Sequence, residues 1–121
     1  MTQLTKAEER IMQIIWRLER CTVSDILKFI EAEQGEEKPP HSSISSIVRI
    51  LEDRGFVSHK AYGRTYEYFP AVTREAYTKS TLSRLVTDYF GGSMSNLVSF
   101  LVKEEKIDKD ELSDMIEQMK D

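Results

Sequence analysis

The first half of the chain carries three amphipathic segments of helical periodicity. In each, apolar residues recur at intervals of three and four, the pattern of a helix that buries one face. Thr5 and Glu8 have the spacing of a capping box before the first segment, and Thr22 precedes the second. Gly35 and Gly55 follow the second and third segments, where a left-handed glycine can end a helix. The three stripes are Ile11, Ile14, Ile15 and Leu18; Val23, Ile26, Leu27 and Ile30; and Ile44, Ile47, Val48 and Leu51.

The third segment has an unusual polar face. It follows the loop EEKPP, and we expect Ser42 or Ser43 to cap it. Serine is a mediocre helix former because its hydroxyl competes for the backbone, so a cluster of serines needs another explanation. Small side chains allow close approach to a partner, and hydroxyls donate to phosphates. The pattern therefore predicts a helix that enters the DNA major groove through Ser42, Ser43, Ser45, Ser46 and Arg49.

A hairpin is predicted directly after this helix. Residues 56–60 and 65–69 are rich in aromatic residues and valine, and Gly63 supplies a positive φ for the turn between them. Lys60, Tyr62 and Arg64 would stand at the tip, where basic side chains reach phosphates. Three helices and a two-stranded ribbon make a winged helix-turn-helix, which we expect over residues 1–72 of a mainly α protein with a small β-hairpin wing.

Residues 73–121 are predicted to form three further short amphipathic helices, over 73–90, 94–105 and from Asp108 onward. Little chain remains to cover their apolar faces, so we expect these faces to meet those of a second copy in a homodimer. A folded-back monomeric bundle is the alternative. The predicted dimerisation residues are Leu82, Leu85, Val86, Tyr89, Leu97, Val98, Leu101, Val102, Leu112, Met115 and Ile116.

Charge and composition place any nucleic-acid surface in the first half of the chain. The 121 residues carry a net charge of −4, yet the segment from His41 to Tyr68 is +1 and that from Thr73 to Asp121 is −3. The apolar runs fall short of the roughly 20 residues that cross a bilayer, and MTQLTKAEER does not resemble a signal peptide. We therefore expect a cytoplasmic protein.

Other functions are open to test. A serine-rich helix face can be plain solvated surface, an aromatic hairpin can be plain core, and a winged helix can bind protein instead of DNA. A metal-sensing or enzymatic function would require Cys21, His41 and His59 to converge, and their spacing matches no zinc motif. We accordingly expect no metal, no cofactor and no catalytic residue.

The segments LTKAEERIMQIIW, VSDIL, ISSIVRILEDRGFVSHKAYGRTYEYFP and FGGS resemble the penicillinase repressor family of the BlaI and MecI type, over nearly the whole chain. The resemblance implies a winged-helix repressor that dimerises through its C-terminal helices and binds an inverted-repeat operator built on TACA and TGTA. It also implies DNA contacts at Ser42, Ser43, Ser46 and Arg49 on the helix, and at Lys60, Tyr62 and Arg64 on the wing.

Two departures from the family pattern bear on regulation. The copper-responsive CopY branch has a cysteine-rich C-terminus, whereas residues 103–121 contain no cysteine, so copper sensing is not expected. In the β-lactam branch the resemblance implies induction by a membrane sensor-protease that cuts an Asn-Phe bond in the second C-terminal helix. That bond aligns with Phe100 and Leu101, where the asparagine is absent.

Overall fold

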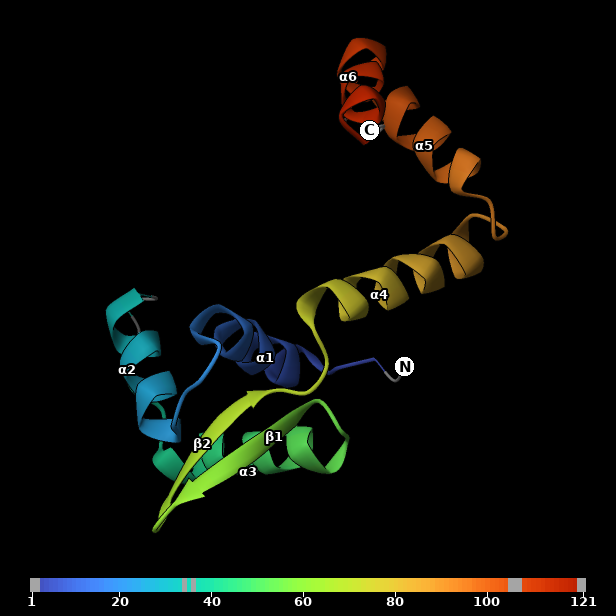
Figure 1. Ribbon diagram of the computed structural model, residues 1–121. Helices are drawn as coiled ribbons and strands as arrows, with labels where there is room; N and C mark the ends of the chain where they lie inside the picture. The colour runs from blue at the N-terminus through green and yellow to red at the C-terminus, as the bar shows by residue number, and fades with distance from the viewer. Residues whose placement is uncertain (1–2, 34, 36, 105–107, 120–121) are drawn as a thin grey trace. The chain divides into compact units, whose positions relative to one another are not determined.

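The computed structural model is shown in Figure 1. It describes residues 3–33, 35, 37–104 and 108–119, without the side chains of Leu112, Met115, Ile116 and Met119. The chain divides into two compact units, one ending at Thr78 and the other beginning at Lys79. Among the described residues, no helix is both long enough and apolar enough to cross a membrane.

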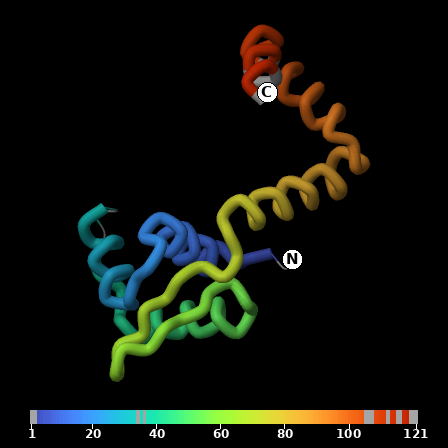
Figure 2. The backbone as a smooth tube through the Cα atoms, in the orientation of Figure 1, coloured from blue at the N-terminus to red at the C-terminus, as the bar shows by residue number. Residues whose placement is uncertain are grey.

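The first unit contains three helices and a hairpin. The elements are α1 (Lys6–Leu18), α2 (Val23–Glu33), α3 (His41–Asp53), β1 (Val57–Tyr62) and β2 (Thr65–Pro70). The α3 helix packs against α1 and α2, while the antiparallel hairpin packs against α1 and α3 (Figures 1 and 2). This is a winged helix-turn-helix, so the predicted fold class is confirmed.

Capping side chains fix the starts of α1 and α2. The Thr5 hydroxyl accepts from the Glu8 N–H at 3.2 Å, and the Glu8 carboxylate accepts from the Thr5 N–H at 2.9 Å. Thr22 and Asp25 make the same reciprocal pair at 3.1 and 2.9 Å. Each pair satisfies two backbone donors that have no partner inside the helix, which confirms both predicted caps.

The predicted cap of α3 by Ser42 or Ser43 is wrong. The helix begins at His41, its N-cap residue is Pro40 in an extended conformation, and no side chain caps it. The Pro40 carbonyl accepts from the Ser43 N–H at 3.0 Å, so both serines already lie within the first turn. Proline is restricted to φ near −65°, and here that restriction starts the helix earlier than the serine pattern suggested.

One hydrophobic core holds the first unit together. Its most deeply buried members have no exposed surface and come from the inward faces of α1, α2 and α3: Met12, Ile15, Ile26, Val48 and Leu51. Burying a side chain of this size contributes about 1.5–3 kcal/mol each. The hairpin joins this core through Phe56, Val57 and Tyr68, so the wing is anchored at its base.

The wing is a regular two-stranded ribbon. Val57 pairs with Pro70 at its base and Tyr62 pairs with Thr65 at its tip, so Gly63 and Arg64 form the turn. Gly63 has the predicted positive φ, of 63°. The strands are longer than predicted, because cross-strand pairing continues through Ala61 and Tyr62.

The first turn of α4 (Arg74–Tyr89) belongs to the first unit. The Tyr77 hydroxyl accepts from the Leu4 N–H at 3.0 Å, and the Tyr77 ring lies 5.7 Å from Trp16 and 5.8 Å from Phe56. These contacts join the first turn of α4 to the first unit, which ends at Thr78.

The second unit contains the rest of α4 with α5 (Met94–Lys103) and α6 (Lys109–Met119). Ser93 caps α5 and Asp108 caps α6, through bonds of 3.2 and 2.7 Å to the N–H groups of Asn96 and Glu111. On α4 the stripe is mostly uncovered: Val86 is 6% exposed, but Leu82, Leu85 and Tyr89 are 39%, 40% and 78% exposed. Leu97, Val98, Leu101 and Val102 are half-buried, and the side chains of Leu112, Met115 and Ile116 lie outside the described set.

Candidate nucleic-acid interface

The predicted contact residues of α3 form its solvent face. Ser42, Ser43, Ser46 and Arg49 are exposed, whereas Ser45 is half-buried on the flank of the helix. The opposite face supplies Ile44, Val48 and Leu51 to the core. Core packing therefore fixes the rotation of α3 about its axis, and this rotation presents small hydroxyl groups and one guanidinium to solvent.

A hollow of about 560 Å³ lies between α3 and the wing. We call it the α3–wing hollow. It brings Ser45 and Arg49 of α3 together with Arg64 of the wing turn, three residues that were predicted to contact DNA. The other predicted contacts, Ser42, Ser43, Ser46, Lys60 and Tyr62, do not line it. The remaining lining residues are Thr22, Val23, Ser24, His41, Glu52, Asp53, Thr65, Tyr66 and Tyr68.

The outer part of the wing holds the predicted wing contacts. The Lys60 ammonium lies 5.6 Å from the centre of the Tyr62 ring, within range of a cation–π interaction. Tyr62 is 52% exposed, and Lys60 and Arg64 are exposed as well. Two cations and an aromatic ring are thus presented on a narrow ribbon, a suitable shape for following a phosphate backbone.

A side-chain pair that the sequence pattern did not reveal joins α3 to the wing. The Nδ1 atom of His59 lies 2.6 Å from Oε2 of Glu52, and its ring stacks on Tyr66 at 4.2 Å with 15° between the ring planes. Glu52 is near the end of α3, and His59 is on β1. No spacing rule connects the two, because they meet only after the hairpin folds back onto α3.

Tyr68 forms part of the floor of the α3–wing hollow. Burial, and secondly the Glu52 carboxylate, raise the pKa of the Tyr68 hydroxyl above its ordinary value. Tyr68 therefore remains a neutral phenol that can donate a hydrogen bond at physiological pH. Its backbone also exchanges two hydrogen bonds with Cys21, of 3.0 and 2.7 Å, which tie β2 to the segment before α2.

The α3–wing hollow has mixed charge. Arg49 and Arg64 are accompanied by Glu52 and Asp53. A phosphate backbone repels carboxylates, so these two acids oppose attraction that does not depend on base sequence. Because the charges in the hollow are mixed, charge alone does not draw a phosphate backbone to it. A nucleic acid that binds there would have to make specific hydrogen bonds or apolar contacts.

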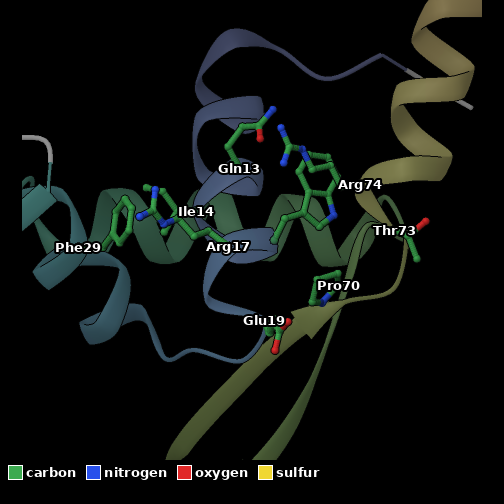
Figure 3. Close-up of a pocket in the computed structure, with 9 residues that line it drawn as sticks. Gln13, Ile14, Arg17, Glu19, Phe29, Pro70, Thr73 and Arg74 are labelled. Atoms are coloured by element: carbon green, nitrogen blue, oxygen red, sulfur yellow. The ribbon is translucent and has the colours of Figure 1, made fainter. Parts of the chain in front are cut away.

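A second hollow, of about 640 Å³, lies over α1 (Figure 3). It is bordered by Phe29 of α2 and by Pro70, Thr73 and Arg74, and the Arg17 guanidinium carbon lies 5.5 Å from the centre of the Phe29 ring. None of the predicted DNA contacts lines it. The α3–wing hollow is therefore the stronger candidate for the interface.

The residues of the metal-sensing alternative do not form a ligand set in the structure. Within the described ranges, no three His, Cys, Asp or Glu side chains are grouped so that they could hold an ion. Cys21 is buried, and burial raises the pKa of its thiol to about 12. His59, on the wing, instead contacts Glu52 of α3.

Comparison with known proteins identifies the family of the chain. The family model described as penicillinase repressor matches residues 4–121. The methicillin resistance regulatory protein MecI of Staphylococcus aureus (strain N315) is 21% identical over 113 residues, which cover 93% of this chain and 89% of MecI. The penicillinase repressor of Bacillus licheniformis is 18% identical over 113 residues, covering 93% of this chain and 86% of that protein.

Two solved structures share the fold. The DNA-binding domain of the repressor BlaI superposes with a TM-score of 0.51 at 21% identity, covering 62% of this chain and 88% of that domain. RosR of H. salinarum gives a TM-score of 0.52 at 22% identity, covering 86% of this chain and 94% of RosR. With the family model matching from Leu4 to the last residue, the chain belongs to the penicillinase repressor family of DNA-binding repressors.

Proposed function

We propose that this chain is a homodimeric transcriptional repressor that places α3 in the major groove of an inverted-repeat operator. The observation that carries the proposal is the α3–wing hollow, which brings Arg49 of the helix and Arg64 of the wing to one surface. The exposed serines Ser42, Ser43 and Ser46 precede Arg49 on the same helix, within two turns of it. A helix with small polar residues can approach base edges closely, and an arginine can bond to guanine in bidentate fashion.

The wing acts as a backbone clamp in this proposal. Lys60, Tyr62 and Arg64 stand on the outer part of the ribbon, and their donors reach phosphates that flank the groove occupied by α3. Such contacts supply affinity and register without reading sequence. Base discrimination is therefore assigned to the exposed face of α3.

The second unit supports a homodimer. Leu82, Leu85 and Tyr89 lie on one side of α4 and are at least 39% exposed in the single chain. Several large apolar groups in one stripe are costly to leave in water, and a two-fold pairing buries each stripe against its copy. A dimer also doubles the half-site contact, which is why the operator is expected to be an inverted repeat. The resemblance to BlaI and MecI implies half-sites built on TACA and TGTA.

Derepression by proteolysis is the proposed switch. The family position aligns with Phe100 and Leu101 on α5, where Phe100 is 49% exposed and its ring lies 5.6 Å from Phe90. Cutting between them would separate Leu101, Val102 and α6 from α4, remove apolar surface from the dimer and weaken operator binding. The resemblance implies that a membrane sensor-protease makes this cut.

Selection of duplexes from random DNA by the full chain, at about 150 mM salt, tests the proposal. We expect enrichment of an inverted repeat whose half-site centres are about 10 base pairs, or a multiple of that, apart. The selected duplex should then bind with an affinity that falls steeply between about 50 and 200 mM salt, as phosphate contacts require.

The same experiment identifies the alternative. A sample that is folded and dimeric yet enriches no sequence would contradict the repressor proposal and favour a winged helix that binds protein. If the selected duplexes share a single half-site and no inverted repeat, only the proposal that the chain binds DNA as a dimer is contradicted.

A further inference from the structure

One exposed side chain of α3 is not explained by the contacts proposed so far. Ile50 is 46% exposed. The other exposed residues of this fully described helix are all polar: His41, Ser42, Ser43, Ser46, Arg49 and Asp53. Ile50 is thus an isolated apolar group on a face that is otherwise built from hydroxyls and charges.

The position of Ile50 places it among the proposed base contacts. Residues four and seven apart in a helix share a face, so Ile50 lies one turn from Ser46 and two turns from Ser43. It follows Arg49 directly in sequence and is exposed as well, but it lies about 100° from Arg49 around the helix axis and does not line the α3–wing hollow. Ser46, the serine one turn before Ile50, is small and does not shield the isoleucine from a surface that approaches α3.

Packing does not account for the residue. The core takes Ile44, Val48 and Leu51 from α3, with Ile47 packed partly against it, whereas Ile50 is outside the core cluster. A polar residue at this position would be compatible with the same fold and would improve solvation of the helix. Single exposed isoleucines are common on protein surfaces, so exposure alone does not indicate a function. The relevant observation is that Ile50 lies on the exposed face of α3.

We propose that Ile50 reads the 5-methyl group of a thymine in the major groove, an inference that rests on the proposed DNA-binding function. The side chain has neither donor nor acceptor, so it cannot bond to a phosphate or to a base edge. The thymine methyl is the apolar group that a base presents in the major groove, and apolar side chains contact it in direct readout. Ile50 would therefore favour thymine over cytosine at one position of each half-site.

Replacing thymine by deoxyuridine tests this contact, because the substitution removes only the methyl group and retains base pairing. Each thymine of the selected operator is replaced in turn, and binding of the full chain is measured by titration. We expect one position in each half-site where the replacement weakens binding about 3- to 10-fold, the effect of removing one buried methyl group from a contact. In Ile50→Ala the same replacement should have no effect.

Asp53→Ala is the matched control. Asp53 lies on the same exposed face but has no methyl group to pair with thymine. This variant should change binding of the thymine and deoxyuridine duplexes by equal factors, so that their ratio remains that of the native chain. Circular dichroism verifies that Ile50→Ala is folded, which is expected because Ile50 is outside the core.

The outcomes are separable. If no thymine shows an effect in the native chain while the operator is still bound, the Ile50 proposal is wrong and the repressor proposal stands. If the effect persists in Ile50→Ala, another side chain reads the methyl group and the assignment is likewise wrong. If no DNA sequence is selected at all, the proposed function fails and the Ile50 contact fails with it.

Discussion

Glu52 and His59 connect the candidate recognition helix to the wing, with 2.6 Å between Oε2 of the carboxylate and Nδ1 of the ring. Both side chains are about 30% exposed, at 31% for Glu52 and 28% for His59, so water only partly competes for the bond. Because His59 also stacks on Tyr66, this one ring positions the hairpin relative to the end of α3. The orientation of the wing is therefore fixed by side chains as well as by the core at its base.

We predict that this pair is energetically coupled. His59→Phe retains an aromatic ring for Tyr66 but removes the bond to Glu52, and we expect the free energy of unfolding to fall by about 1 kcal/mol. Urea denaturation of His59→Phe, Glu52→Ala and the double variant gives the coupling, expected at about 0.5–1.5 kcal/mol. If the losses in the free energy of unfolding of the two single variants add up to the loss in the double variant, the contact contributes no stability.

We predict that Arg49 reads a base. Arg49→Ala should weaken binding to the selected operator by about 1–3 kcal/mol and relax base preference at one position of each half-site. Arg74→Ala is the matched control, because it removes the same charge from the hollow over α1 and should leave operator binding unchanged. If Arg49→Ala weakens all sequences equally, Arg49 holds a phosphate and does not specify sequence.

We predict that the Glu8 carboxylate makes the free energy of unfolding fall in acid. The hydrogen bond from the Thr5 backbone N–H lowers the pKa of Glu8 below its ordinary value, burial opposes this shift, and the Arg54 guanidinium lowers the pKa further. A carboxyl whose pKa is lower in the folded state stabilises the fold above its unfolded-state pKa, and this contribution is lost as the pH falls through the folded-state pKa. The free energy of unfolding should thus decline as the pH falls below the ordinary pKa of a glutamate side chain, about 4.3.

Glu8→Gln isolates the charge of this carboxylate. The glutamine amide oxygen can still accept hydrogen bonds from the Thr5 N–H and from Arg54, but these bonds are no longer charge-assisted on the acceptor side, so we expect a loss of about 1–2 kcal/mol near neutral pH. In this variant the free energy of unfolding should decline less steeply in acid than it does in the native chain. Glu9→Gln, at an exposed position of the same helix, is the control and should leave both quantities close to the native values. If the free energy of unfolding of Glu8→Gln declines in acid as steeply as that of the native chain, Glu8 is not the group responsible for the decline.

We predict that Leu85 belongs to a dimer surface. Placing a charge on the exposed stripe with Leu85→Asp should weaken self-association by about 3 kcal/mol, or ~100-fold, since the buried contact is lost and a carboxylate must be desolvated. Sedimentation equilibrium measures the change. Thr87→Asp, exposed on the same helix but off the stripe, should remain dimeric. A dimeric Leu85→Asp would show that another surface mediates association.

Much of this architecture follows from local sequence. The spacing of Thr5 and Glu8 determined a capping box, Gly63 determined the turn of the wing, and the stripe of Ile44, Val48 and Leu51 determined which face of α3 is buried. These features could be predicted because each depends on residues within a few positions of one another, where backbone geometry and side-chain periodicity are decisive.

Other features depended on the tertiary structure. The serines of α3 do not cap it, because the geometry of Pro40 starts the helix earlier, and residues up to Thr78 join the first unit because the Tyr77 hydroxyl reaches Leu4. The pairing of Glu52 with His59 and the exposure of Ile50 likewise had no local signal. Such contacts join elements whose distance from one another is set by packing, so no local pattern predicts them. Sequence alone determined the elements and the candidate surface. The three-dimensional fold decided which side chains meet on that surface.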